Sequence, residues 1–268
     1  MNMNIFDAHT HIASWFTIEE SEKNLLDGMD RKNVLFSLIS HADCSSFPSE
    51  GTADVPPLSA EEGLRQCLDF AKRHPGRIYV AVWVKPRVEK TPSPELIRLI
   101  EENLDLVKAI KFHPYCERLP ADSPLMEPYY ELARRFHLPV LIHTALDMNS
   151  AIVHFITAAE EHPDLRFVAA HLELGSDHRF SIRAIRNLPN AYCDTAWVDL
   201  ESALLAMETM GEDRVIFGTD APIEGESTLD NPVYEEYFAN ADGPKRAKMA
   251  KLLFQNGVDF YQIPHENK

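Results

Sequence analysis

The stretch Asn4–His11, with the sequence NIFDAHTH, sets the expectation for the whole chain. Its short apolar run leads into two histidines, His9 and His11, which are two positions apart. On a β-strand, side chains at that spacing point to the same face. Histidine is the commonest protein ligand for zinc and similar ions. The stretch is therefore either half of a metal site or two polar residues at a strand end, and any further ligands must come from elsewhere in the chain.

Short β-type runs alternate with longer helical patterns along the rest of the sequence. Eight strands are predicted, at residues 4–8, 34–39, 78–84, 109–113, 139–143, 166–171, 191–194 and 214–218. Helices are predicted at residues 18–32, 59–73, 94–103, 124–136, 150–161, 177–187, 200–210, 233–239 and 244–254. The strands are rich in β-branched and other apolar residues, which is typical of a parallel sheet covered by helices.

Eight such repeats within about 220 residues fit an α/β fold of the (β/α)8 TIM-barrel type. A doubly wound open sheet is the alternative, but no glycine-rich phosphate loop follows the first strand. No internal repeat, low-complexity tract or linker divides the chain. We therefore expect residues 1–268 to form a single TIM-barrel domain.

The composition narrows the classes of partner. Of the 268 residues, 45% are hydrophobic and 25% are charged, with a formal net charge of −16. That charge argues against a nucleic-acid partner or an anionic membrane surface, because both need clustered Lys and Arg. No apolar run approaches the ~18 residues of a membrane span, and no signal-peptide pattern opens the chain. The four cysteines are widely separated, so we expect no disulfide, no zinc–thiolate site, and a reduced, cytoplasmic location.

Polar and charged side chains stand where several predicted strands end. In a (β/α)8 barrel the catalytic groups lie at the C-terminal ends of the strands, which meet at one mouth. The side chains at those ends are His9, His11, Lys111, His113, His143, His171 and Asp220. Histidines and a carboxylate that converge in this way predict a metal or proton-transfer site.

Five short motifs around these residues resemble those of a known superfamily. They are Asp7–His11 (DAHTH), Ile110–Pro114 (IKFHP), Leu141–Thr144 (LIHT), Ala170–Leu172 (AHL) and Phe217–Asp220 (FGTD). In this order they resemble the amidohydrolase superfamily, and most closely its amidohydrolase-2 branch of metal-dependent hydrolases and decarboxylases. The resemblance runs from residue 4 to about residue 222. It implies a (β/α)8 barrel with a divalent metal at the mouth.

The resemblance also implies roles for individual residues. His9, His11 and His143 would be metal ligands, and Asp220 would be a ligand that also takes a proton from metal-bound water. His171 would bind a second metal or polarise the substrate. Such a donor set suits one or two divalent ions, zinc above all, although manganese or iron use similar ligands. Three nitrogens and a carboxylate leave a position for water, and a bound zinc lowers the pKa of that water to about 7.

Lys111 and His113 are also candidate catalytic residues, and each has more than one possible role. They share a strand face, so Lys111 should point inward together with His113. In some superfamily members a lysine at strand four is carboxylated and bridges two metals, whereas an unmodified Lys111 would bind a substrate carboxylate. His113 precedes Pro114 and could serve only to shape the loop.

For other residues near the strand ends we expect mainly structural roles. Asp7 would lie deeper in the barrel, His41 would belong to loop structure, and Asp194 would either orient a ligand or cap a helix. Glu173 is expected to face the mouth. The long loop 41–58 after the second strand is expected to help cover the site.

The intact ligand set favours an enzyme over a binding protein with a vestigial site. The first interpretation is a metal-dependent hydrolase of a small amide, ester or lactone. The alternative is a decarboxylase or hydratase on the same barrel, for which Lys85, Arg87 and Lys111 are candidates to bind a substrate carboxylate. We expect a small-molecule substrate as the partner, and the sequence leaves a homo-oligomer open.

Overall fold

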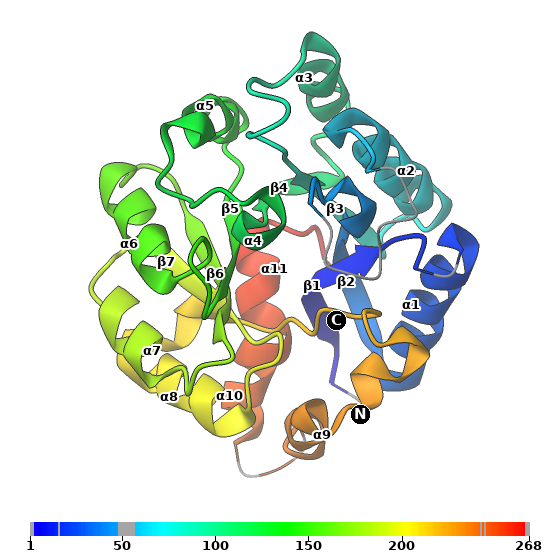
Figure 1. Cartoon of the computed structure of the whole chain (residues 1–268). Helices are drawn as coiled ribbons and strands as arrows, with labels where there is room; N and C mark the ends of the chain where they lie inside the picture. Colours follow the sequence, from blue (N-terminus) through cyan, green and yellow to red (C-terminus); the bar gives the residue numbers. More distant parts are fainter. Residues whose placement is uncertain (1–2, 16, 48–56, 242, 244, 266–268) are drawn as a thin grey trace.

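The computed structural model describes residues 3–15, 17–47, 57–241, 243 and 245–265. Eight parallel strands form one sheet in the order in which they occur in the chain (Figure 1). The strands are β1 (Ile5–Ile12), β2 (Val34–His41), β3 (Ile78–Trp83), β4 (Val107–Phe112), β5 (Val140–Ala145), β6 (Phe167–Leu174), β7 (Ala191–Asp194) and β8 (Val215–Ile216).

The first and last strands meet, which closes the sheet. The Ala8 N–H donates to the Phe217 carbonyl at 2.9 Å, and the Asp220 N–H donates to the His9 carbonyl at 2.7 Å. Thr10 and Ala221 form a further parallel bridge. The predicted (β/α)8 barrel is therefore confirmed, and its closing seam runs beside the histidines of β1.

A ring of helices surrounds the strands (Figure 1). The α-helices are α1 (Ile18–Lys32), α2 (Ala60–Arg73), α3 (Pro94–Glu101), α4 (Pro114–Glu117), α5 (Glu127–Phe136), α6 (Ile152–Glu161), α7 (Arg179–Ile185), α8 (Leu200–Met210), α9 (Pro232–Ala239), α10 (Arg246–Ala250) and α11 (Asn256–Tyr261). At the start of α2, Ser59 and Glu62 form the capping box that their spacing predicts. A short 3-10 turn, η1 (Ala42–Cys44), follows β2. It occupies the start of the expected loop 41–58, of which residues 48–56 lie outside the described residues.

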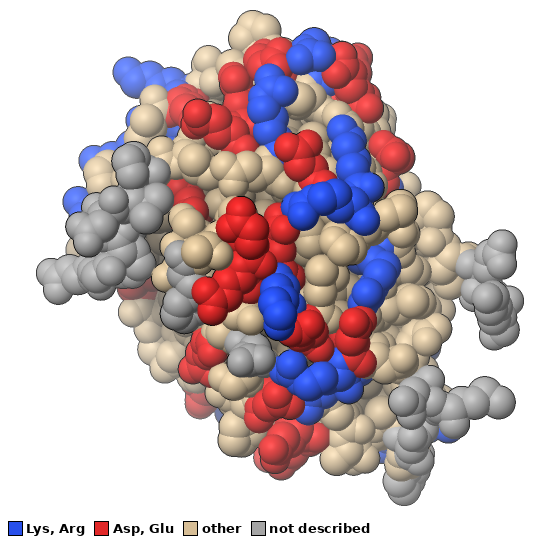
Figure 2. Space-filling model, turned by 90° about the vertical axis from the view of Figure 1, so that its right-hand side faces the viewer, with Lys and Arg blue, Asp and Glu red and all other residues tan. Residues whose placement is uncertain are grey.

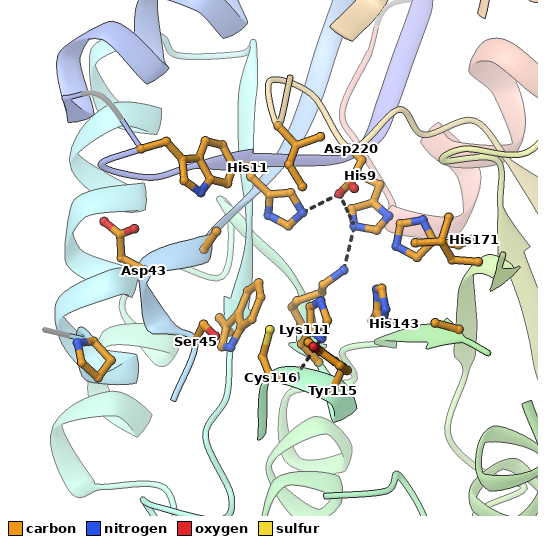
Figure 3. A pocket seen from close by; sticks show the side chains of 18 of the residues that line it. His9, His11, Asp43, Ser45, Lys111, Tyr115, Cys116, His143, His171 and Asp220 are labelled. Carbon is orange, nitrogen blue, oxygen red and sulfur yellow. Dashed lines mark hydrogen bonds and ion pairs between the residues drawn. The ribbon is translucent and has the colours of Figure 1, made fainter. Parts of the chain in front are cut away.

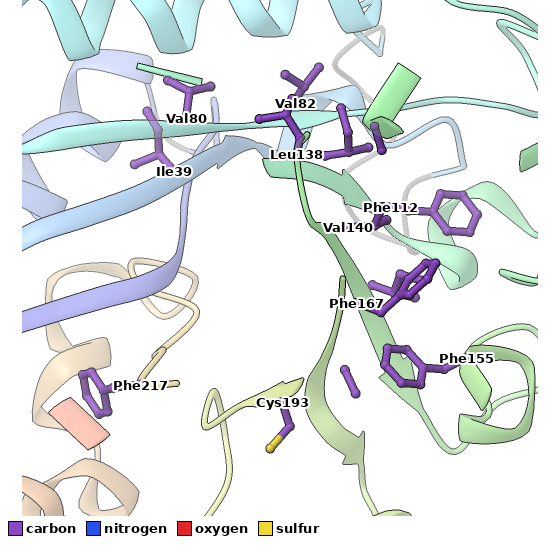
Figure 4. Packing of buried hydrophobic residues seen from close by; sticks show 14 of the residues in the cluster. Ile39, Val80, Val82, Phe112, Leu138, Val140, Phe155, Phe167, Cys193 and Phe217 are labelled. Carbon is purple, nitrogen blue, oxygen red and sulfur yellow. The ribbon is translucent and has the colours of Figure 1, made fainter. Parts of the chain in front are cut away.

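Alternation along each strand divides the core into two layers. On β3, Val80 and Val82 belong to the layer between the strands and the helices, whereas Tyr79 and Ala81 belong to the barrel interior. Figure 4 shows part of the outer layer, where Val80 and Val82 leave the strand on the side of the helices. Because both faces of the strands are buried, the strands read in the sequence as nearly continuous apolar runs.

The barrel interior is closed by α11 at the N-terminal ends of the strands. Val258, Phe260 and Tyr261 join the interior cluster, and the Phe6 and Tyr261 ring centroids are 5.9 Å apart. A Cβ on Gly257 would lie 2.6 Å from Phe6 Cδ1, so a glycine is needed for α11 to approach β1 this closely. The sequence predicts helix only to residue 254, whereas α11 continues to Tyr261 through Gly257, although glycine disfavours helix interiors. A π-helical turn (Lys251–Gln255) joins α10 to α11, and packing overrides that preference.

The face built by α1, α2 and α3 carries acidic and basic side chains close together (Figure 2). Arg77 pairs with Asp30 at 2.8 Å and Arg98 pairs with Glu102 at 2.7 Å. Exposed pairs of this kind contribute about 0–1 kcal/mol each, so the barrel core carries most of the stability. In the described part of the chain, no helix is long and apolar enough to cross a membrane.

Candidate active site

The seven side chains that the sequence places at strand ends all line one cavity of about 670 Å³ at the C-terminal mouth of the barrel. They are His9, His11, Lys111, His113, His143, His171 and Asp220. Figure 3 shows His9, His11, Lys111 and Asp220 converging, with His143 and His171 beside them. Since β1 runs to Ile12 and β6 to Leu174, His9, His11 and His171 lie inside their strands rather than at the last residue.

Asp220 brings a carboxylate oxygen between two imidazoles. Its Oδ1 atom is 2.8 Å from His11 Nε2 and 3.3 Å from His9 Nε2. The ligand atoms of these three residues all lie within 4.8 Å of one another. His143 lines the same cavity but is not part of this close group, so its role as a ligand stays a prediction.

Hydrogen bonds on the far side of each ring fix the orientation of the histidines. His9 Nδ1 is 2.8 Å from Asp194 Oδ2, His11 Nδ1 is 3.0 Å from Ser40 Oγ, and His171 Nδ1 is 3.0 Å from the Ala196 carbonyl oxygen. Nitrogens that face a carboxylate or carbonyl oxygen carry the proton, which leaves Nε2 with a free lone pair.

The histidines of the cavity are held neutral. Burial lowers the pKa of His9 and of His11, and it lowers the pKa of His171 to about 4. The lone pair of His9 Nε2 therefore faces the Asp220 carboxylate, which is also an acceptor, while His11 Nε2 lies at hydrogen-bond distance, 2.8 Å, from the same oxygen. Acceptors this close repel one another unless a proton or a cation lies between them. A divalent ion fits this donor set, because ligands of one ion with bonds near 2.1 Å stand roughly 3 Å apart.

Asp220 is set up to remain a carboxylate. Its burial alone would raise its pKa, but the hydrogen bond with His11 holds the pKa well below its usual value. The second oxygen, Oδ2, accepts a hydrogen bond from the Trp197 indole N–H at 2.9 Å. Sequence reasoning misses Trp197, although its position three residues after the end of β7 was a signal that it lies at the mouth.

Lys111 lies in the cavity as a buried cation. Its Nζ atom is 2.7 Å from His9 Nε2 and the residue is 0% exposed. Burial lowers the pKa of Lys111 to about 8, so it still carries a proton at neutral pH. An ammonium group thus lies against the His9 lone pair, which shows that this position accepts a positive charge.

His113 belongs to an aromatic stack that lines the cavity. Its ring centroid is 5.3 Å from that of Trp83 and 3.8 Å from that of His143, with interplanar angles of 24° and 15°. His113 Nδ1 accepts a hydrogen bond from the Cys116 N–H at 3.4 Å, which starts α4. The Nε2 of neutral His113 is therefore a donor, and the residue both shapes the loop and lines the site.

Two carboxylates next to the site have structural positions. Asp194 orients His9, while its other oxygen accepts from the His171 N–H at 2.9 Å, and α8 is capped by Asp199 instead. Asp7 accepts a hydrogen bond from the Thr219 N–H at 3.0 Å and another from the Thr219 hydroxyl, so it ties β1 to β8. Of the two roles open to Asp194, the orienting one is observed.

The structure also decides the expectations for Glu173 and His41. Glu173 does not line the cavity: it accepts hydrogen bonds from the Ile152 N–H at 3.1 Å and the Ser181 hydroxyl at 2.9 Å, which tie α6 and α7 to β6. The strand carries left-handed φ angles from His171 to Glu173, which turn this side chain away. His41 contacts Gln66 at 2.8 Å, in keeping with a structural role.

Lys85 and Arg87 are also absent from the cavity lining. Lys85 donates to the Leu58 carbonyl at 2.6 Å, and Arg87 donates to the Arg118 carbonyl at 2.7 Å. Among the described residues, Lys111 is thus the one Lys or Arg that lines the cavity. A substrate carboxylate would find a single protein cation there.

The fold of the chain is similar to that of several solved structures. The 5-carboxyvanillate decarboxylase of Novosphingobium aromaticivorans, solved with manganese, is 13% identical with a TM-score of 0.71, covering 97% of this chain and 96% of that one. The 2,6-dihydroxybenzoate decarboxylase from Rhizobium is 14% identical with a TM-score of 0.67, covering 97% and 99%. A probable 2-pyrone-4,6-dicarboxylic acid hydrolase from Acinetobacter baumannii is 12% identical with a TM-score of 0.66, covering 98% and 100%.

At these identities the likeness to solved structures establishes the fold alone. No curated protein matches the chain in sequence. A family model described as amidohydrolase matches residues 6–263 and so includes every residue of the mouth. The chain therefore belongs to the amidohydrolase family and is an enzyme of that superfamily.

Proposed function

We propose that the protein is a metal-dependent hydrolase of a small amide, ester or lactone. The observation that carries this proposal is the Asp220 carboxylate, which has one oxygen between the Nε2 atoms of His9 and His11. These three residues would hold a divalent ion, with His143 as a further ligand. When bound, such an ion lowers the pKa of water and polarises a carbonyl. Zinc suits the nitrogen-rich donor set best, and manganese is the competing choice.

Side chains around the ion would transfer the proton and stabilise the charge that develops on the substrate. Asp220 is ionised and would accept a proton from the attacking water and pass it to the leaving group. Lys111, protonated at neutral pH, would donate a hydrogen bond to the acyl oxygen as negative charge develops there. His171 presents an Nε2 lone pair, so it would act as a ligand or proton acceptor rather than as a donor to a carbonyl.

A decarboxylase is the second candidate, and two observations favour it. Lys111 offers one buried cation for a substrate carboxylate. The stack of Trp83, His113 and His143 offers a flat wall for an aromatic ring. In that reaction no water attacks the substrate, so proton transfer to Asp220 would not limit turnover.

The test is Asp220→Asn, which keeps the size and one ligand oxygen but removes the base. We expect turnover to fall by at least the ~10²-fold typical of a lost general base, with normal folding and part of the metal retained. Turnover, its pH profile and metal content should be measured on the same samples. Near-wild-type turnover in a metal-loaded variant would remove Asp220 from the mechanism and favour the lyase.

Product analysis separates the two reactions directly. A panel of lactones, amides and aromatic carboxylates would be incubated in ¹⁸O-labelled water. A hydrolase places the label in the product carboxylate, whereas a decarboxylase releases carbon dioxide. We also propose a cytoplasmic location, supported by four cysteines that are all free thiols.

A further inference from the structure

The cavity has a second polar end, on the side away from the histidines. Figure 3 shows Asp43 across the cavity from His143 and His171. Asp43 belongs to η1, directly after β2, and it lines the cavity together with Ser14 and Trp15. None of the roles proposed for the metal ligands or for Lys111 uses this end.

Asp43 is a largely buried carboxylate without a counter-ion among the described residues. Its Oδ2 accepts hydrogen bonds from the Ser14 N–H at 2.9 Å and from the Ser14 hydroxyl, while Oδ1 makes none to the described part of the chain. The nearest imidazole nitrogen, His41 Nδ1, is 3.9 Å from Oδ2. That nitrogen accepts a hydrogen bond from the Asp43 N–H, so it does not neutralise the charge. The side chain is only 15% exposed, and its unpaired Oδ1 would be stabilised by a donor or cation that a ligand supplies.

An indole N–H in the same cavity also lacks a partner. Trp83 is 4% exposed, and its Nε1 makes no hydrogen bond to any described residue. Buried donors are nearly always paired in folded proteins, so this N–H calls for an acceptor supplied by a ligand. Trp15 and Tyr115 line the cavity as well, and aromatic faces of this kind attract organic cations.

The charges of the cavity are divided between its two ends. Lys111 and the ionised Asp220 place charges of both signs beside His9, to which a bound ion would add positive charge, whereas Asp43 places a negative charge at the opposite side. Asp147 adds a second carboxylate to the lining, with Oδ1 already bound by the Asn149 and Ser150 N–H groups. A substrate oxygen is therefore favoured at the Lys111 end, and a positive group is favoured at the Asp43 end.

We propose that the substrate carries a protonated amine that binds Asp43, while its carbonyl reaches Lys111 and the metal ligands. The aromatic side chains would line the path between them, and the Trp83 N–H would donate to an oxygen of the substrate. The substrate class is then an amino-substituted amide, ester or lactone rather than a dicarboxylate. This class rests on the proposed hydrolase function, but the recognition of an amine by Asp43 does not.

Binding tests the recognition of the amine without requiring turnover. Phenethylamine, phenethyl alcohol and hydrocinnamate are similar in size and carry a cation, a neutral group and an anion. Their affinities for the metal-loaded protein would be measured by calorimetry. We expect phenethylamine to bind about tenfold more tightly than the alcohol, the ratio that 1.4 kcal/mol gives, and hydrocinnamate to bind most weakly at the Asp43 end.

Asp43→Asn keeps an acceptor for Ser14 but removes the charge, so it should bring phenethylamine down to the affinity of the alcohol. The matched control is Asp105→Asn, an exposed change of the same charge before β4, at the other end of the barrel. That control should keep the preference for the amine. Equal affinities of wild type for the amine and the alcohol, or an unchanged preference in Asp43→Asn, would overturn the proposal. The wild-type comparison decides it even if the Asp43 variant does not fold.

Turnover then tests the substrate class. The para-nitroanilides of β-alanine, butyrate and succinate form a matched series with a cationic, neutral or anionic end. We expect kcat/KM to fall in that order, and we expect Asp43→Asn to narrow the ratio between the first two. Amine binding without hydrolysis of any member would refute the hydrolase function and leave amine recognition standing. Hydrolysis without a preference for the β-alanine compound would refute the amino-substituted substrate class and leave the hydrolase function standing.

Discussion

Replacing Asp194 by Asn should weaken metal binding by changing which nitrogen of His9 carries the proton. Asn keeps the shape, and its amide oxygen can still accept from the His171 N–H at 2.9 Å and the Ala196 N–H at 3.1 Å. Its NH2 group then faces His9 Nδ1, where Asp194 Oδ2 now accepts at 2.8 Å. A donor at that position favours the tautomer protonated at Nε2, which has no lone pair for a metal.

The cost follows from the burial of this pair, since His9 and Asp194 are each 1% exposed. Restoring the metal-binding tautomer would break the hydrogen bond from the Asn NH2 group and leave two buried donors facing each other, which costs about 1–3 kcal/mol. That corresponds to a loss of roughly 10–100-fold in metal affinity, the range found for partners that orient metal-bound histidines.

Calorimetric titration with zinc and manganese measures the affinity, and the ¹⁵N shifts of His9 report its tautomer without any metal. Asp199→Asn is the matched control, because Asn caps a helix about as well as Asp and Asp199 touches none of the metal-site histidines. An Asp194→Asn protein that is folded and binds metal as tightly as wild type would refute the tautomer argument.

Three further outcomes are expected. Treatment with a chelator should abolish activity, while circular dichroism and the melting temperature change little because the apolar barrel layers are separate from the mouth. Absence of metal by elemental analysis would contradict the proposed metal site. Burial raises the pKa of Glu117 from 4.5 to about 7, so folding loses stability as pH rises through that window. Glu117→Gln should remove up to about 3 kcal/mol of this loss, which urea unfolding at about pH 5 and about pH 8 would detect, and an unchanged pH dependence would contradict it. Shortening the loop 41–58 within residues 48–56 should change KM with little change in melting temperature, and the opposite result would show that the loop is structural.

The fold could be predicted because the strand and helix segments each show their own spacing of apolar residues in the sequence. On β3, alternate residues serve the outer layer and the interior, and since both are apolar the strand stands out as one uninterrupted run. Polar groups at strand ends then fall at a common mouth because parallel strands all end on the same side. The same reasoning finds the seven strand-end side chains that line the cavity, including Lys111 and Asp220.

The features of the site that the sequence does not predict depend on contacts between residues of different strands and loops. Strand spacing gives the face on which Lys111 lies, but not that its ammonium reaches His9 on another strand at 2.7 Å. Trp197 approaches Asp220 only because the chain after β7 turns over the mouth, with Trp197 at a φ of 60°. The expectation that Glu173 faces the mouth is wrong because three consecutive left-handed residues on β6 break the alternation that would put Glu173 on the face of His171.

The seam between β1 and β8 also sets the order in which the site can be made. His11 and Asp220 meet although they are 209 positions apart. At translation rates of about 5–20 residues per second, roughly 10–40 s pass between synthesis of the first histidines and synthesis of the carboxylate. Throughout that time β1 has an unpaired edge, which nascent strands of other chains or a chaperone can occupy. A chain truncated before residue 215 would keep the histidines and this open edge, so loss of the last strand should appear first as aggregation during synthesis.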